Sequence, residues 1–150
     1  MTTPTETVPR ATSGQLATIR LDGDLYGVEV EHVQEVLKSQ GLTRVPLAPP
    51  AVAGLINLRG QVVTAIELRE RLGRPPRPTD TDAVVIVVRL HGEAVSLLVD
   101  SIADVVDVDA SDFEAPPDTL EGQARDLIRG AFKLDGQLLL ALDVQKAVSA

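Results

Sequence analysis

The hydrophobic residues of this chain lie in short runs that are separated by polar breaks. Four segments share one arrangement, in which an apolar run, the pattern Leu-x-Gly and a second apolar run follow one another. Runs rich in Val, Ile and Leu on either side of a glycine-containing break are typical of β-hairpins. The predicted hairpins span residues 19–30, 56–68, 88–99 and 132–144, with glycines at Gly23, Gly60, Gly92 and Gly136.

Further strands are predicted outside the hairpins, at 42–45 and 103–108. The run AVVIVV at 83–88 is apolar throughout, which indicates a strand that is covered on both faces. Together these segments give about ten short strands, as in a small barrel or a sandwich. The chain is therefore predicted to be mainly β.

Helical periodicity is confined to a few places. In segment 30–38, four apolar residues recur at helical spacing, so a short amphipathic helix is expected after the first hairpin. These residues are Val30, Val33, Val36 and Leu37. Two weaker helical turns are predicted at 69–72 and 144–148, and the other segments are predicted to be irregular. The irregular segments are a disordered tail at 1–14, a Pro-rich connector at 73–82 and a long, mobile polar loop at 114–126.

The first and the fourth hairpin each lead directly into a predicted helical segment. This similarity has two explanations. The chain could form two related lobes, or the likeness could be a coincidence in a Val-rich sequence.

Composition narrows the class of protein. A chain of 150 residues is long enough to bury the core of one domain without a metal or a disulfide. A net charge of −8 and an aromatic content of 2% argue against a nucleic-acid binder such as an OB-like barrel. The chain contains no cysteine, no long apolar run and no secretory signal pattern at its start, so a cytoplasmic protein is expected.

Few side chains could support catalysis or metal binding. His32 and His91 are the only histidines, and neither lies in a motif for a nucleophile triad or a zinc site, so both are expected at the surface. A run of carboxylates resembles a calcium loop in part but lacks the glycine that lets such a loop bend, so we interpret it as the solvated edge of a strand. The run comprises Asp100, Asp104, Asp107, Asp109, Asp112 and Glu114. No enzymatic activity, metal or cofactor is expected.

One turn residue departs from local preference. The residue before the hairpin glycine is Asp22, Arg59, His91 or Asp135, and tight turns favour Asp or Asn at this place. A long cation at Arg59 could serve solubility or packing of its aliphatic stem. It could also contact a partner, because the guanidinium is a rigid fork of donors suited to carboxylates.

Several of these segments closely resemble the CheW family of bacterial chemotaxis coupling proteins. The resemblance is carried by LYGVEVEHVQEVL, PPAVAGLINLRGQVVTAIELRERLG, DAVVIVVRLHGEAVSLLVDSIADVVDV and LIRGAFKLDGQLLLALDVQKAV, and it covers residues 15–148. It implies a single domain made of two small five-stranded SH3-like β-barrels, one from about 42–102 and the other from the N- and C-terminal segments. It also implies a non-enzymatic adaptor that joins the cytoplasmic hairpin tips of chemoreceptors to the regulatory domain of a chemotaxis histidine kinase, in arrays at the inner face of the membrane. The adaptor could also pack with itself in rings.

The resemblance also implies which residues contact partners. Glu35 corresponds to the family's functional glutamate on the helix, and Arg59 to its functional arginine, so we expect Arg59 at an exposed hairpin tip, held by Glu35. The other residues that the family pattern implies are Val33, Val36, Gly54, Asn57, Gly60, Val84 and Val105. An apolar groove between the barrels would receive the receptor tip, as a helix does in a groove.

The chain departs from the family pattern at Thr64, Glu67 and Ser96, where relatives often have proline, aspartate and glycine. These differences bear on partner specificity rather than on the fold. Two alternatives stay open: a CheW-like adaptor for gliding, twitching or another non-flagellar pathway, and a small β-barrel enzyme or ligand-binding protein that uses the acidic run and His91.

Overall fold

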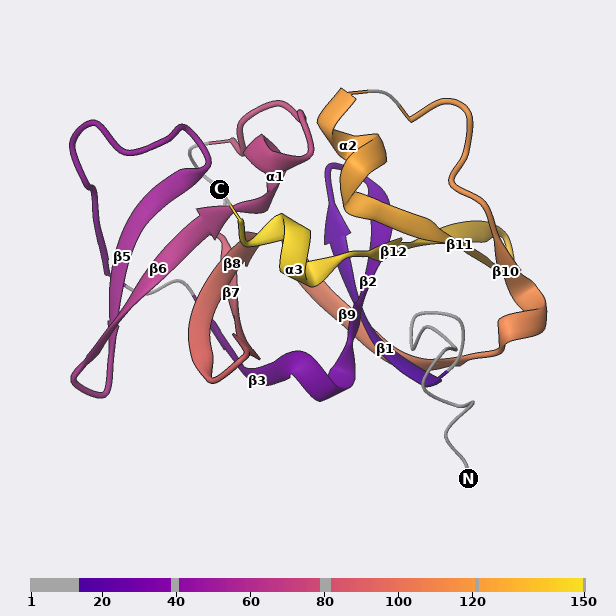
Figure 1. Ribbon diagram of the computed structural model, residues 1–150, viewed down its shortest axis with the longest axis horizontal. Helices are drawn as coiled ribbons and strands as arrows, with labels where there is room; N and C mark the ends of the chain where they lie inside the picture. Colours follow the sequence, from indigo (N-terminus) through magenta and orange to yellow (C-terminus); the bar gives the residue numbers. More distant parts are fainter. Residues whose placement is uncertain (1–13, 39–40, 79–81, 121, 150) are drawn as a thin grey trace.

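The computed structural model describes residues 14–38, 41–78, 82–120 and 122–149. These residues form two six-stranded β-sheets with a few short helices (Figure 1). The predicted tail at 1–14 lies outside the described residues except for Gly14, which begins the first strand. The prediction of a mainly β chain is confirmed.

The first sheet takes strands from both ends of the chain, and we call it the terminal sheet. Its order is β10-β11-β12-β2-β1-β9. Neighbouring strands pair antiparallel, except that β12 and β2 are parallel. The strands are β1 (Gly14–Leu21), β2 (Asp24–Glu29), β9 (Ser101–Val108), β10 (Phe113–Glu114), β11 (Ile128–Leu134) and β12 (Gln137–Leu142).

The second sheet, the middle sheet, has the order β3-β7-β8-β6-β5-β4. Here β6 and β8 are the parallel neighbours. The strands are β3 (Val33–Lys38), β4 (Leu42–Thr43), β5 (Val52–Leu58), β6 (Gln61–Glu67), β7 (Val84–Leu90) and β8 (Glu93–Val99). In each sheet the two outermost strands are consecutive in the chain, which makes each sheet curl back on itself.

The resemblance had implied closed barrels of five strands. Instead, each sheet has six strands, and in the described part of the chain its outermost strands do not pair with each other. The additional strands, β4 and β10, are only two residues long. The chain therefore forms two curled, open sheets.

All four predicted hairpins are present, and each has a two-residue turn. In three of these turns the residue before the glycine also has positive φ, at 51° for Asp22, 51° for Arg59 and 50° for His91. Positive φ at both central residues defines the type I′ turn, whose twist matches that of a hairpin.

The predicted helix at 30–38 is wrong. Only a 3₁₀ turn, η3 (Val30–His32), is present there, and the chain then continues as strand β3. A β-bulge in the pairing of β3 with β7 adds one residue, so Val33 and Val36 lie opposite Val88 and Ile86, on one face of the sheet. The bulge thus gives a strand the three-residue spacing that is typical of a helix.

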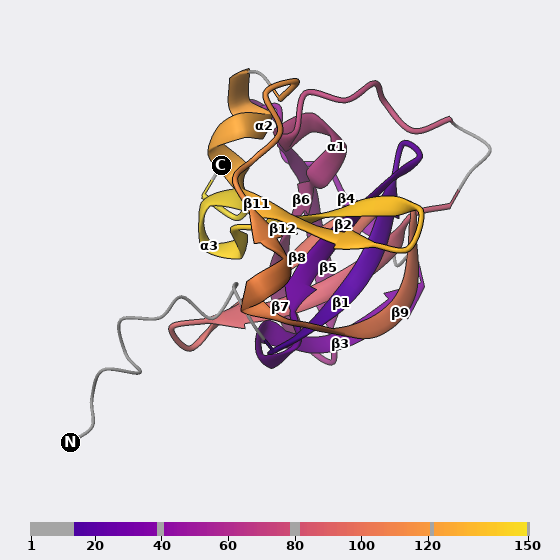
Figure 2. The ribbon, with the colours of Figure 1, turned by 90° about the vertical axis from the view of Figure 1, so that its right-hand side faces the viewer.

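The predicted turns at 69–72 and 144–148 are helices α1 (Leu68–Arg71) and α3 (Val144–Ala147). The predicted polar loop at 114–126 is partly wrong, because it contains the end of β10 and most of helix α2 (Gly122–Leu127). Helix α2 packs beside α3, as both views show (Figures 1 and 2). A second 3₁₀ turn, η4 (Ala110–Asp112), joins β9 to β10.

The chain consists of two halves of the same design. Each half contains a hairpin, an edge strand, a two-residue strand, a second hairpin and a short helix, from β1 to α1 and from β7 to α3. The parallel strand pairs of the two sheets have the same register. Ala65 of β6 pairs with Ser96 of β8, and the equivalent residue Ala141 of β12 pairs with Gly27 of β2. Each half gives its first hairpin to one sheet and its remaining strands to the other. The first hairpin is therefore equivalent to the third, and the similarity between the first and fourth hairpins was a coincidence.

Apolar side chains form one central core and two smaller ones. The central core joins the sheets and includes Ile19, Tyr26, Ile66, Ile86 and Leu142. The smaller cores fill the inner side of each curled sheet, around Phe132 in one and Val87 in the other. This arrangement explains why strand 83–88 is apolar on both faces: Val85 and Val87 face the core of the middle sheet, while Ile86 and Val88 face the central core.

Candidate functional site

An ion pair joins the tip of the β5–β6 hairpin to edge strand β3. Arg59 donates two parallel hydrogen bonds to Glu35, from Nη1 to Oε2 at 2.7 Å and from Nη2 to Oε1 at 2.8 Å. The Arg59 side chain is 76% exposed, whereas that of Glu35 is 18% exposed. The hairpin tip and its carboxylate partner are therefore placed as predicted, although Glu35 lies on a strand rather than on a helix.

The backbone at Arg59 has an unfavourable conformation. A φ of 51° is left-handed, which Gly, Asn and Asp tolerate better than a long side chain does. The Asn57 side chain holds the turn, because its Oδ1 accepts a hydrogen bond from the Gly60 N–H at 2.9 Å. Local turn chemistry would favour Asn or Gly at position 59, so the guanidinium itself is the feature that needs an explanation.

The bidentate contact fixes the charge of both groups. The hydrogen bonds from Arg59 hold the pKa of Glu35 below its ordinary value, and the same bonds raise the pKa of Arg59. One guanidinium edge is occupied by the carboxylate, and the exposed remainder of the side chain faces solvent. The pair is therefore an ordered, charged feature on the surface.

The apolar residues that the family pattern implies lie on both sheets. Val36 is 38% exposed on β3 and Val105 is 56% exposed on β9, and these two strands are edges of their sheets. Val33 and Val84 are half-buried and pack against the central core. The structure thus brings Glu35, Arg59, Asn57 and Gly60 together at one tip and leaves the apolar residues on edge strands and on β7.

Gly54 lies at a close approach of two strands that leaves no room for a side chain. A Cβ atom at this position would lie 2.3 Å from the backbone oxygen of Thr43, and the φ of Gly54 is 156°. Its equivalent in the other half is Gly130, where a Cβ atom would lie 2.3 Å from the Phe113 ring and 2.5 Å from the Glu114 oxygen. A glycine is thus required wherever a two-residue strand crosses closely over the bulged hairpin strand.

Sequence reasoning missed a network around Asp100, which begins the acidic run. Asp100 accepts hydrogen bonds from Arg69 at 2.5 and 2.9 Å, from Arg77 at 3.0 Å and from the Asp22 backbone at 2.9 Å. Burial alone would raise the pKa of Asp100, but these bonds lower it from 3.8 to about 2. Arg77 also pairs with Glu67, so this network ties the predicted connector to both sheets.

The interpretation of the acidic run as a strand edge is confirmed for its later part. Strand β9 is the outermost strand of the terminal sheet, and Asp104 and Asp107 are exposed on it. The Asp109 side chain accepts a hydrogen bond from the Ser111 N–H at 2.9 Å, which lowers the pKa of Asp109. These carboxylates occupy a solvated edge and a turn.

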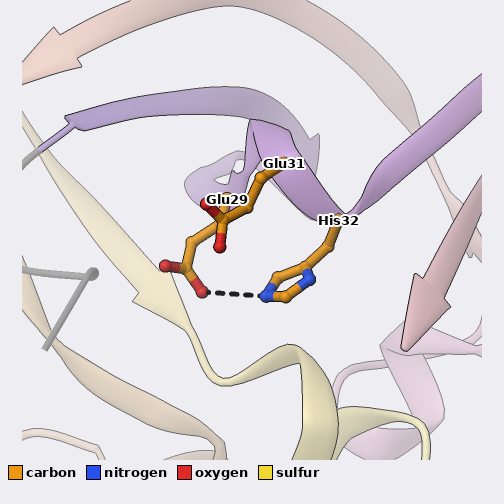
Figure 3. A group of neighbouring side chains, drawn as sticks. All are labelled: Glu29, Glu31 and His32. Carbon is orange, nitrogen blue, oxygen red and sulfur yellow. Dashed lines mark ion pairs between the residues drawn. The ribbon is translucent and has the colours of Figure 1, made fainter. Parts of the chain in front are cut away.

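The two histidines lie at the surface, as predicted, with His91 exposed and His32 half-buried. Both line one cavity of about 240 Å³ beside α3, together with Glu29 and Arg129. Glu29, Glu31 and His32 place one ligand atom each within 4.8 Å of one another, so they could hold a metal ion (Figure 3).

A larger cavity, of about 580 Å³, lies away from all of the predicted site residues. Leu25, Leu72, Leu120 and Leu138 line it, together with Arg74. The guanidinium of Arg74 donates a hydrogen bond to the Tyr26 hydroxyl at 3.0 Å, and burial raises the pKa of Tyr26. Among the described residues, no helix is both long enough and apolar enough to span a bilayer.

Comparison with known proteins identifies the family. Residues 15–150 match the model of the CheW-like domain. The chain belongs to the CheW family. The resemblance found in the sequence motifs is thus confirmed, and it extends over nearly the whole chain.

Individual relatives agree with this assignment. The chain is 30% identical to the chemotaxis protein CheW of Bacillus subtilis, over 88% of this chain and 85% of that one. It is 29% identical to the chemotaxis protein CheW of Treponema pallidum, over 91% of this chain and 82% of that one. The crystal structure of the scaffolding protein TtCheW from Thermoanaerobacter tengcongensis is similar with a TM-score of 0.80 and 27% identity, covering 92% and 94% of the two chains.

Membership of the CheW family establishes the broad function. The protein is a non-enzymatic adaptor or scaffold of chemotaxis-type signal transduction, as the sequence predicted. This role implies interaction with chemotaxis receptors and a kinase, and it does not favour the alternative of a ligand-binding barrel.

Proposed function

We propose that this CheW-like protein couples the cytoplasmic hairpin tips of chemoreceptors to the regulatory domain of a chemotaxis-type histidine kinase. The protein would act in the cytoplasm, in receptor arrays at the inner face of the membrane, and could also pack with copies of itself in rings. Its two curled sheets would serve as the two SH3-like lobes of a single domain spanning residues 15–148.

The Arg59–Glu35 pair is the observation that supports this proposal most strongly. A long cation occupies a left-handed turn position with an exposed side chain, although Asn or Gly would suit the turn better. Such local conflicts are found mainly at functional sites, and arginine is a frequent anchor of interfaces. We infer that Glu35 orients the guanidinium so that its free edge can bind a partner carboxylate or backbone carbonyl.

The apolar part of the interface would use the edge strands. Val36 and Val105 are exposed valines on β3 and β9, and exposed apolar side chains on sheet edges are suited to contact with a partner. Val33 and Val84 would support these positions from the central core, while Asn57, Gly60 and Gly54 would keep the β5–β6 hairpin in shape.

A binding experiment with matched tip variants tests the proposal. The partners are the regulatory domain of the cognate chemotaxis kinase and a receptor cytoplasmic fragment, and affinities are measured by calorimetry. Arg59→Asn removes the guanidinium but keeps a residue that tolerates positive φ, so the turn is preserved. Asp135→Asn makes the matched change at the equivalent hairpin of the other half.

We expect Arg59→Asn to weaken binding to at least one of these partners by about tenfold or more, which corresponds to about 1.4 kcal/mol. Asp135→Asn should leave both affinities unchanged. Equal losses in the two variants, or no loss in either, would rule out Arg59 as a partner-binding residue. No binding of the parent protein to either partner would refute the proposed coupling itself.

A further inference from the structure

We infer that the turn between β2 and β3 binds a divalent transition-metal ion such as Zn²⁺, with Glu29, Glu31 and His32 as its protein ligands. This site is independent of the Arg59–Glu35 pair. It lies at the point where the chain crosses from the terminal sheet to the middle sheet.

The three side chains converge from a short stretch of chain. Glu29 is the last residue of β2, and Glu31 and His32 belong to the 3₁₀ turn η3. Figure 3 shows the two carboxylates and the imidazole grouped beside this turn, with the contact between Glu29 and His32 as a dashed line. Glu29 is buried, His32 is half-buried and Glu31 is exposed, so a bound ion would lie at the protein surface with one side open to solvent.

The spacing of one donor pair, His32 and Glu29, matches that of two ligands on a small tetrahedral ion. His32 Nε2 lies 3.3 Å from Glu29 Oε1. Two ligand atoms that are each about 2.0–2.1 Å from a tetrahedral metal are separated by about 3.3 Å. One imidazole with two carboxylates is a ligand set that suits zinc, and the nitrogen donor disfavours calcium and magnesium, which prefer oxygen ligands.

The two-fold repeat of the fold supplies an independent argument. Val33 pairs with Val88 in the middle sheet, and Ile102 pairs with Ile19 in the terminal sheet, and these two pairs are equivalent in the repeat. Glu31 precedes Val33 by the same number of positions as Asp100 precedes Ile102. Glu31 is therefore the equivalent of Asp100. At Asp100 the protein binds two cations of its own, the guanidinium groups of Arg69 and Arg77. The equivalent of one proposed ligand, Glu31, thus already pairs with cations in the other half.

Arg69, one of the two arginines that bind Asp100, has a neutral residue as its equivalent in the second half. Helix α3 corresponds to α1, so that Gln145 takes the place of Arg69 and Asp143 takes the place of Glu67. Glu67 and Asp143 both cap their helices, and Asp143 and Gln145 line the 240 Å³ cavity with Glu29 and His32. Helix α3 and its cap thus bring Asp143 and the neutral Gln145 to the cavity, where α1 and its cap bring Glu67 and Arg69 to Asp100.

Two arginines that line the cavity, Arg89 and Arg129, would repel a metal ion. Arg129 Nη1 lies 3.8 Å from Glu29 Oε1, which is too long for a hydrogen bond, and Arg129 is partly exposed and could turn away. Arg89 is held by hydrogen bonds to the Gln34 side chain and to the Gly92 carbonyl. Because Arg129 lies beside Glu29 and carries a positive charge, its removal should strengthen metal binding.

The test is calorimetric titration of the untagged full-length protein with Zn²⁺ alone, followed by NMR of the histidine side chains. We expect one Zn²⁺ per chain and a large shift of the His32 ring signals. His32→Gln and Glu29→Gln should each lower the affinity by about tenfold or more, and Arg129→Gln should raise it. Asp107→Asn, which removes an exposed carboxylate on β9, is the charge-matched control and should bind as the parent does.

Circular dichroism of each variant checks that the fold is retained. Absence of saturable binding would overturn the inference. The same conclusion would follow if His32→Gln bound Zn²⁺ like the parent, or if Asp107→Asn lost as much affinity as Glu29→Gln, because either result would indicate general attraction of cations to an acidic chain.

Discussion

The middle and terminal sheets have the same strand order and register, yet they carry different side chains at equivalent points. Where the β5–β6 hairpin of the middle sheet has Arg59, the β11–β12 hairpin of the terminal sheet has Asp135. The partner of Arg59, Glu35, has Asp104 as its equivalent on β9. One sheet thus has a bidentate ion pair at these two positions, and the other has an acidic residue at each of them.

Other positions are the same in both sheets. Gly54 and Gly130 each permit a close crossing by a two-residue strand, and Ala65 and Ala141 each occupy the parallel pairing at the centre of a sheet. Positions that are shared between the halves belong to the architecture. Positions that differ, such as Arg59 and Arg69, give each half its own ion pairs.

The largest expected effect concerns the shared glycines. Gly54→Ala and Gly130→Ala should each lower the free energy of unfolding by about 2–3 kcal/mol, because the new methyl group would overlap backbone or ring atoms. Gly41→Ala is the control, since a Cβ atom there meets nothing within 4 Å. Urea denaturation measures all three. A change at Gly130 without one at Gly54 would show that the two crossings are not equivalent.

The next effect concerns the network that differs between the halves. Asp100→Asn should lower the free energy of unfolding by about 2 kcal/mol, because it removes the charge that pairs with the nearly buried Arg69 and Arg77. Glu31→Gln makes the same change at the equivalent position, where the carboxylate is exposed and its interactions add little to stability. Chemical denaturation in the absence of metal should show a much smaller loss for Glu31→Gln.

The same carboxylate makes stability depend on pH. The pKa of Asp100 is lowered from 3.8 to about 2 in the folded protein, so its stabilising contribution is complete above about pH 4 and is lost as the pH falls toward 2. Other carboxylates also titrate in this range, and comparison of the parent with Asp100→Asn isolates the contribution of this one. The stability difference between the two proteins, followed by denaturation from pH 5 to pH 2, should shrink as the pH falls. A constant difference would contradict the lowered pKa.

The smallest expected effect on stability is at the hairpin tip. Arg59→Asn should change the melting temperature by no more than about 2 °C, because the lost ion pair is exposed and Asn tolerates the left-handed turn better. Asp135→Asn should behave similarly. Differential scanning calorimetry provides the measurement, and a loss of many degrees in Arg59→Asn would make Arg59 a structural residue.

Much of the fold follows from the local pattern of the sequence. The four hairpins, their two-residue turns and the short helices α1 and α3 depend on nearby residues, such as the glycines of the turns and the Glu67 and Asp143 caps. The tip with Arg59 could be found for the same reason, because a turn residue that violates local preference is visible in the sequence alone.

The remaining features depend on contacts between distant segments. The apolar residues of strand β3 recur at helical spacing, and only the bulged pairing with β7 makes this segment a strand. The Asp100 network joins residues that are 23 to 78 positions apart, so the spacing of the acidic run could not indicate it. His32 and His91 share a cavity because the two halves exchange their hairpins, which places the tip of one half beside the crossover of the other. The sequence by itself thus determined the turns, the strands and the exposed arginine, since these depend on the preferences of neighbouring residues. Only the tertiary structure decided which charges meet, because the partners of each charge are chosen by the pairing of distant strands.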